Sequence, residues 1–156
     1  MSRNSRSTAA ELGEAGEALV AAWLEQQGWA IVARRWRCRS GELDLVARSA
    51  DGGELAVVEV KTRSPGNWDH DGALAVTAAK QRKLIRAALE FLAAHPALAD
   101  LGWRFDVALV GRAARSSLAT EDDRPMEPIA LGQPVWFEGQ ALVLLDYWPG
   151  AIELNG

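Results

Sequence analysis

The segment ELAVVEVKTR, from Glu54 to Arg63, decides how this sequence folds. Its apolar, β-branched run predicts a strand, and the side chains of a strand alternate between two faces. One face is apolar and consists of Ala56, Val58 and Val60. The other face carries Val57 together with two charged side chains, Glu59 and Lys61. Because a buried unpaired charge is costly, a core strand of this kind predicts a partner or a cation beside the charges.

A second acidic strand precedes this one in the sequence. GELDLV, residues 41–46, places Asp44 between two leucines, and a polar turn at residues 49–53 follows. A hairpin with this turn would bring Asp44 close to Glu59. Two adjacent carboxylates stay ionised together when a cation neutralises them, and hard oxygen ligands suit Mg²⁺ or Mn²⁺. The alternative is that Glu59 and Lys61 lie on the solvated face of an edge strand, where charges discourage pairing with other chains.

The spacing of these charges resembles that of known nucleases. Asp44 followed by Glu59-Val60-Lys61 is similar to the PD-(D/E)xK nuclease superfamily, which includes restriction enzymes and Holliday-junction resolvases. More closely, the chain resembles the YraN family of predicted endonucleases, from about residue 13 to residue 110. The matching positions are Gly13, Glu17, Trp23-Leu24, Gly28, GELDLV at 41–46, VEVKTR at 58–63 and RFDV at 104–107. The family often has Asn where Arg35 stands.

The resemblance implies an α/β fold with a restriction-endonuclease-like core. A mixed central β-sheet would be flanked by helices, and the apolar periodicity of the chain itself predicts the order α-β-β-β-α-β. The implied activity is Mg²⁺-dependent (or Mn²⁺-dependent) endonucleolytic hydrolysis of DNA, with branched DNA and a homodimer both left open. The implied catalytic residues are Asp44, Glu59, Lys61 and Glu17. The implied metal ligands are Asp44, Glu59, the backbone carbonyl of Val60, and Glu17, with Glu14 as the substitute for Glu17.

Some of these acids also have a simpler interpretation. Glu17 lies beside the apolar face of the predicted first helix, where an exposed or boundary acid is common. Asp106 is either a structural acid that pairs with Arg104 or a residue that supports the site. Glu42 is assigned a supporting position next to the metal ligands.

Charge is unevenly distributed along the chain. The net charge is −4, but residues 1–86 carry 13 Lys/Arg against 11 Asp/Glu, and residues 87–156 carry 4 against 10. The basic residues therefore lie in the half that contains the motifs, where they are able to neutralise phosphates or simply form solvated faces. The predicted substrate contacts are Arg63, Lys80, Gln81, Arg37 and Arg35.

Length and composition predict a single domain over residues 9–156, after a flexible tail at residues 1–8. The expected helices span residues 9–27 and 77–94. The expected strands span residues 29–37, 42–48, 55–62, 103–110 and 141–148, the last of them at a sheet edge. Residues 111–139 read as a variable loop or insertion.

Several classes of protein are disfavoured by the sequence. No apolar run approaches the roughly 20 residues that span a bilayer, and the start of the chain does not resemble a signal peptide. Cys38 is the single cysteine, so an intrachain disulfide is excluded, and we expect a cytoplasmic protein. In the loop after the acidic strand, Asp69-His70-Asp71 is either solvated or a ligand group, and Trp68 is a candidate substrate contact.

Two other functional classes are compatible with these patterns. The first is a nuclease fold retained as a nucleic-acid-binding or assembly module without turnover, which the acidic net charge favours. The second is a small acidic protein that packs against a partner and carries Asp44, Glu59 and Lys61 in solvent.

Overall fold

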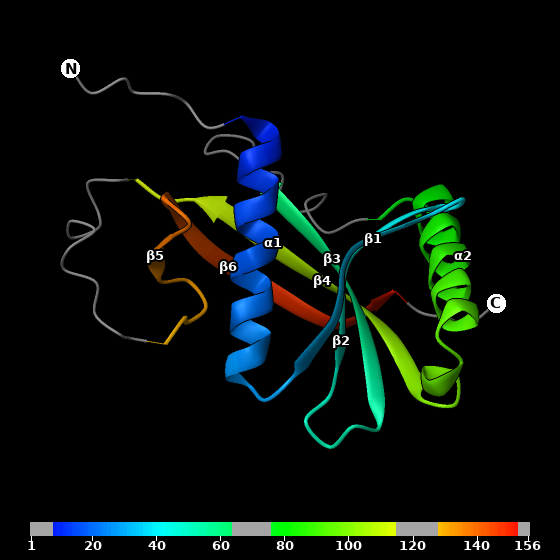
Figure 1. The fold of residues 1–156 in the computed structure, drawn as a ribbon. Coiled ribbons are helices and arrows are strands. Elements are labelled where there is room, and N and C mark those ends of the chain that lie inside the picture. The colour runs from blue at the N-terminus through cyan, green and yellow to red at the C-terminus, as the bar shows by residue number, and fades with distance from the viewer. Residues whose placement is uncertain (1–7, 64–75, 115–127, 153–156) are drawn as a thin grey trace.

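A mixed β-sheet lies between two helices in the computed structural model, which describes residues 8–63, 76–114 and 128–152 (Figure 1). In chain order, the elements are α1 (Ala9–Gln26), β1 (Ala30–Cys38), β2 (Gly41–Arg48), β3 (Glu54–Arg63), α2 (Ala78–Ala94), the short 3-10 helix η1 (Pro96–Leu98), β4 (Gly102–Arg112), β5 (Pro134–Phe137) and β6 (Gln140–Ile152). The predicted order α-β-β-β-α-β is confirmed.

The six described strands are arranged in the order β1-β2-β3-β4-β6-β5. β3 and β4 are parallel, and all other neighbouring pairs are antiparallel. α2 lies between β3 and β4 in the sequence, as a parallel pair requires, because its connection has to cross over a face of the sheet. The predicted mixed sheet is therefore confirmed.

Each face of the sheet buries one helix. On the first face, α1 packs over a cluster that includes Ala56 and Val58, with Val60 at its border. On the second face, α2 packs over a cluster that includes Leu55 and Val57. The alternation predicted for β3 is thus confirmed, and it sends Glu59 toward the side of α2.

Capping residues fix where both helices begin. Thr8 accepts a hydrogen bond from the N–H of Glu11 at 3.1 Å, so this residue of the predicted tail caps α1. Thr77 caps α2 in the same way, accepting from the N–H of Lys80 at 3.2 Å. Gly28 follows α1 with φ 91°, a left-handed conformation that suits glycine at a helix end. Within the described residues, neither helix combines the length and apolarity that crossing a membrane requires.

The C-terminal part differs from the sequence-based prediction. The segment assigned to a variable loop, 111–139, contains the end of β4 and the whole of β5. β6 is longer than predicted and does not lie at the edge, since it pairs with β4 on one side and its start pairs with β5 on the other. Pro149 and Gly150 resemble a strand terminator, yet the strand continues because the N–H of Gly150 donates to the side chain of Asp106.

Candidate metal centre

The candidate site begins where β2 and β3 separate. Their ladder ends at the pair Leu45 and Val58. Asp44 immediately precedes Leu45 on β2, and its Oδ2 accepts a hydrogen bond from the N–H of Val60 at 2.9 Å. A carboxylate therefore takes the place that a backbone carbonyl of the neighbouring strand occupies in a regular ladder. This fork opens a gap in the sheet that side chains from both faces are able to reach.

A close helix–strand contact brings a second acid to the fork. At Gly16 of α1, a Cβ atom would lie 2.5 Å from Oγ1 of Thr62 on β3. Any larger residue would overlap the Thr62 side chain as it is placed, and Glu17 is the next residue along the helix. One carboxylate oxygen each from Glu17, Glu42 and Asp44 lie within 4.8 Å of one another. Three acids from α1 and β2 thus share one small volume.

Glu59 reaches the same region from β3. Its Oε1 lies 2.7 Å from Nζ of Lys80 in the first turn of α2, and its side chain is only 11% exposed. The charge of Glu59 acts on both Asp44 and Glu17. The hairpin predicted from the sequence therefore brings Asp44 and Glu59 together, as expected.

Two acids of this cluster have raised pKa values. Burial, reinforced by the charges of Glu42 and Glu59, raises the pKa of Glu17 to about 7. Burial, followed by the charge of Glu59, raises the pKa of Asp44 to about 8, although the N–H of Val60 opposes this shift. The nearby cations do not offset the repulsion among the acids. A hard cation bound between them would do so, because it favours the ionised carboxylates.

Three basic residues of the predicted site contact these acids. Arg35 donates from Nε to Glu17 at 2.6 Å and from Nη1 to Glu14 at 2.7 Å. Arg37 donates to Glu42 at 3.2 Å, but its side chain is 80% exposed, so this pair contributes little. Lys80 is the third, through its contact with Glu59.

Lys61 lies among other positive charges. Burial, then the charges of Lys80 and Arg63, lowers the pKa of the Lys61 ammonium, and Glu59 opposes the shift. Arg63 is the last residue of β3. Gln81, another predicted substrate contact, donates to the backbone carbonyl of Val76 at 2.8 Å.

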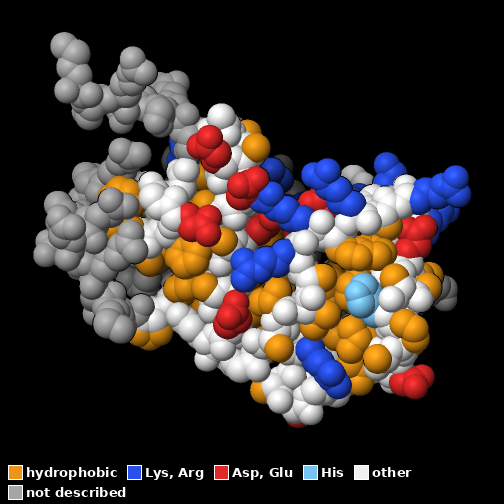
Figure 2. All heavy atoms as spheres, in the orientation of Figure 1, with side chains coloured by type: hydrophobic (Ala, Val, Ile, Leu, Met, Phe, Trp, Pro, Cys, Tyr) orange, Lys and Arg blue, Asp and Glu red, His pale blue; other side chains and the backbone are white. Residues whose placement is uncertain are grey.

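An open cavity of about 320 Å³ gives solvent access to the acids. It is lined by Ser40, Gly41, Glu42, Asp44, Glu59, Lys80, Lys83 and Leu84, which come from the start of β2, β3 and the first turns of α2. In Figure 2, Lys and Arg side chains gather along the upper edge of the molecule, over the β1–β2 hairpin and the start of α2. Acidic side chains over α1 lie beside them. A negatively charged floor with a basic rim is suited to a cation and an anionic ligand together.

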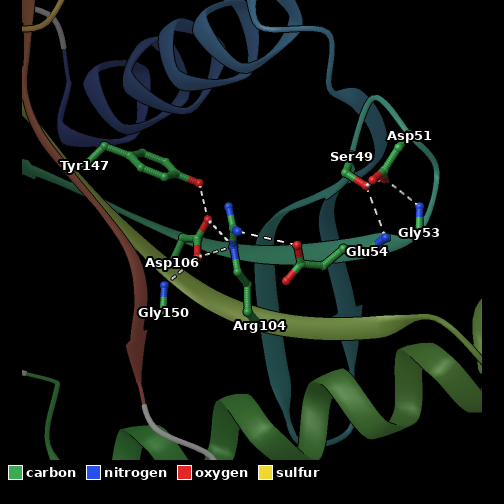
Figure 3. Close-up of polar contacts among 8 residues, drawn as sticks. All are labelled: Ser49, Asp51, Gly53, Glu54, Arg104, Asp106, Tyr147 and Gly150. Carbon is green, nitrogen blue, oxygen red and sulfur yellow. Dashed lines mark hydrogen bonds and ion pairs between the residues drawn. The ribbon is translucent and has the colours of Figure 1, made fainter.

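Asp106 belongs to a different arrangement (Figure 3). This carboxylate is fully buried and accepts hydrogen bonds from Nε of Arg104 at 3.0 Å, the hydroxyl of Tyr147 at 2.5 Å and the N–H of Gly150 at 2.9 Å. Arg104 also reaches Glu54 on β3 at 3.5 Å. The pairing of Asp106 with Arg104 that the sequence suggested is therefore present.

The comparisons with known proteins identify the family. The sequence pattern of the family described as "Uncharacterised protein family UPF0102" matches residues 16–110. The chain belongs to this family. It is 50% identical over 149 residues to a UPF0102 protein of Synechococcus sp. (strain JA-3-3Ab), covering 96% of each chain. It is 42% identical over 163 residues to one from Acaryochloris marina, covering 97% of this chain and 95% of that one.

A UPF0102 protein of Gloeobacter violaceus is 58% identical over 96 residues, which cover 62% of this chain and 75% of that protein. The UPF0102 match contains all four carboxylates of the cluster, whereas β5 and β6 lie beyond it. The acids and the elements that bring them together are therefore within the part that defines the family.

Sequence reasoning overlooked one residue and underestimated another. Gly16 permits the approach of α1, but a contact between residues 46 positions apart leaves no local pattern. Glu42 was assigned a supporting position, yet its oxygen lies within the cluster of three acids. Its spacing of two from Asp44 on one strand was the signal for a shared face.

Two predicted features remain untested. The backbone contact described for Val60 is made by its N–H, so a metal bond from its carbonyl stays a prediction. Trp68 and the segment 69–71 lie outside the described residues.

Proposed function

We propose that the chain is a Mg²⁺- or Mn²⁺-dependent endonuclease of the cytoplasm that hydrolyses phosphodiester bonds of DNA. The observation that carries the proposal is the convergence of Glu17, Glu42 and Asp44 at the strand fork, with their oxygens within 4.8 Å. The resemblance of the sequence to the YraN endonucleases adds support, because two of these three acids, Glu17 and Asp44, are catalytic positions that the resemblance implies.

The donor atoms at the fork fit a hard divalent cation. The acids that line the cavity offer carboxylate oxygens only, and neither histidine nor cysteine is among its lining residues. Asp44, Glu59 and Glu17 would hold the ion, with Glu42 as an additional oxygen donor. Once bound, such an ion lowers the pKa of a coordinated water and stabilises negative charge on a phosphate.

The groups around the fork would orient the metal ligands and bind the phosphates of the substrate. The N–H of Val60 orients Asp44. Lys61 would hold the attacking water or the phosphate oxygen by charge, because an ammonium group, with an ordinary pKa of about 10.4, is a poor general base. Burial and the charges of Lys80 and Arg63 lower this pKa, and Glu59 opposes the shift. Lys80 and Lys83 line the cavity and would neutralise backbone phosphates. Arg63, Gln81 and Arg37 would extend this contact.

A DNA cleavage assay tests the proposal. Full-length protein is incubated with labelled duplex and branched DNA, with and without Mg²⁺. We expect Glu59→Gln and Lys61→Ala to abolish Mg²⁺-dependent cleavage, with thermal unfolding still cooperative. Glu25→Gln is the matched control, since Glu25 lies on α1 and pairs only loosely with Arg34, at 3.4 Å on the surface. Undiminished cleavage by both site variants would contradict the assignment.

The ion pair between Glu59 and Lys80 favours a second candidate, a DNA-binding module without turnover, because an internal cation already neutralises one acid. Asp44→Asn separates the two functions. A binding module would keep its DNA affinity and show no cleavage in any variant, whereas the enzyme would lose cleavage. Sedimentation of the protein with and without DNA tests whether it forms the homodimer that the resemblance leaves open.

A further inference from the structure

One residue of β1 has a backbone conformation that its surroundings do not require. Arg35 has φ 47°, although its neighbours Arg34 and Trp36 pair regularly with Leu45 and Leu43 of β2. Few residues other than glycine adopt this left-handed conformation, and it is retained only where other contacts stabilise it. The residue directly across the ladder, between Leu43 and Leu45, is Asp44.

Turn chemistry does not account for Arg35. Glu138 is the one other described residue besides glycine with a positive φ, at 49°. It lies with Gly139 in the two-residue turn between the paired residues Phe137 and Gln140. Gly139 also has a positive φ, 74°, and a type I′ turn requires positive φ at both central positions. Arg35 lies inside a strand, so the cause has to be sought in its side chain.

The guanidinium of Arg35 holds two carboxylates of α1. Nε lies 2.6 Å from Glu17 and Nη1 lies 2.7 Å from Glu14. The two acids are three residues apart and share one helix face, which matches the planar fork of a guanidinium. The Glu17 side chain is 18% exposed, whereas that of Glu14 is 54% exposed. The contact with Glu17 is therefore the better shielded of the two.

We infer that Arg35 is a positioning residue of the metal centre, which fixes one oxygen of Glu17 so that its carboxylate faces Glu42 and Asp44. This inference rests on the proposed metal function of that cluster. The two carboxylates occupy the guanidinium, so its role differs from the substrate contact that the sequence suggested. Hydrogen bonds that orient metal-binding carboxylates typically affect metal affinity by about 10- to 100-fold.

Titration calorimetry of the full chain with Mn²⁺ tests this role. Arg35→Asn removes the cation, while Asn adopts positive φ more readily than most residues. We expect its Mn²⁺ affinity to fall by about 10-fold. Arg34→Asn is the matched control, because Arg34 lies on the same strand and pairs with Glu25 at 3.4 Å, with both side chains 53% exposed. Its affinity should equal that of the wild type.

Arg35→Lys provides a rescue that a purely structural role would not produce. A single ammonium keeps the charge but not the fork, so we expect an affinity between those of Arg35→Asn and the wild type. Thermal unfolding in EDTA checks each variant, and if Arg35→Asn does not fold, the lysine variant decides by the same criterion. Wild-type affinity in the folded variant would overturn the inference alone. Absence of Mn²⁺ binding by the wild type would overturn the proposed function and this inference with it.

Discussion

The two groups of acids in this sheet differ in how their charge is balanced. Asp106 is fully buried, and a guanidinium, a hydroxyl and an N–H all donate to it. The cluster at the strand fork is more exposed, yet its acids face one another, and the pKa of Glu17 and of Asp44 is raised. An unbalanced cluster, rather than burial as such, is what marks a candidate functional site.

The largest loss of stability is expected from replacing Asp106, the acid whose charge is balanced by its hydrogen-bond donors. Asp106→Asn removes the charge that faces Arg104 and turns a shared acceptor into a partial donor. We expect the free energy of unfolding to fall by about 3 kcal/mol, measured by urea denaturation. Mn²⁺ affinity should stay unchanged in the folded fraction. A variant as stable as the wild type would mean that the Asp106 contacts contribute little.

Gly16→Ala should disturb the packing of α1, and through it the acids at the strand fork. The new Cβ would lie 2.5 Å from Oγ1 of Thr62, and we expect α1 to shift and take Glu17 with it. We expect a loss of about 2 kcal/mol of stability and weaker Mn²⁺ binding. Gly13→Ala is the control on the same helix, because a Cβ there meets no atom within 4 Å. Equal Mn²⁺ affinity in both variants would show that the close approach of α1 is not needed.

Asp44→Asn sharpens the comparison, because we expect it to raise the free energy of unfolding, whereas the same substitution at Asp106 should lower it. It removes one of the repelling charges, and the amide oxygen is still able to accept from the N–H of Val60. We expect the metal-free protein at pH 8 to gain on the order of 1 kcal/mol, a modest value because solvent screens the site. Destabilisation of this variant in EDTA would argue that the charge of Asp44 is already neutralised.

The pH dependence of stability should reveal the raised pKa values. Unfolded carboxyl groups titrate near pH 4, whereas Glu17 and Asp44 in the folded chain do so at about 7 and about 8. The folded protein therefore keeps these two carboxyl groups protonated to a higher pH than the unfolded chain does. The stability that this protonation contributes is lost as the pH rises through 7 and 8. In EDTA, we expect Tm to decrease by a few degrees between pH 5 and pH 8.5, on the order of 1 kcal/mol.

Glu17→Gln should flatten that curve, and Mn²⁺ should raise Tm more at pH 8.5 than at pH 6, since metal and protons compete for the acids. A Tm that does not change with pH in EDTA would contradict the raised pKa values.

Most of the fold was predictable, because it rests on local alternation. The valines of β3 and the acids at Asp44 and Glu59 follow period two, and the polar turn between their strands fixed the hairpin. β5 was missed since four residues in an acidic, small-residue segment carry too weak a pattern. The end of β6 was missed because Pro149 and Gly150 are typical of a strand end, whereas the N–H of Gly150 donates to the buried carboxylate of Asp106, which is distant in the sequence but lies on the neighbouring strand β4.

The candidate site was predictable in its acids but not in its supporting contacts. The spacing of Asp44 and Glu59 is written in the sequence. The left-handed Arg35 and the close approach of Gly16 depend on residues that are distant in the sequence and meet only in the folded chain.

Titration calorimetry with Mn²⁺ at pH 8, comparing the wild type with Asp44→Asn, tests the central claim most directly. If the acids at the strand fork form a metal centre, the wild type will give saturable binding and Asp44→Asn will give none, although it remains folded in EDTA. Absence of binding by the wild type, or equal binding by both proteins, would contradict the account.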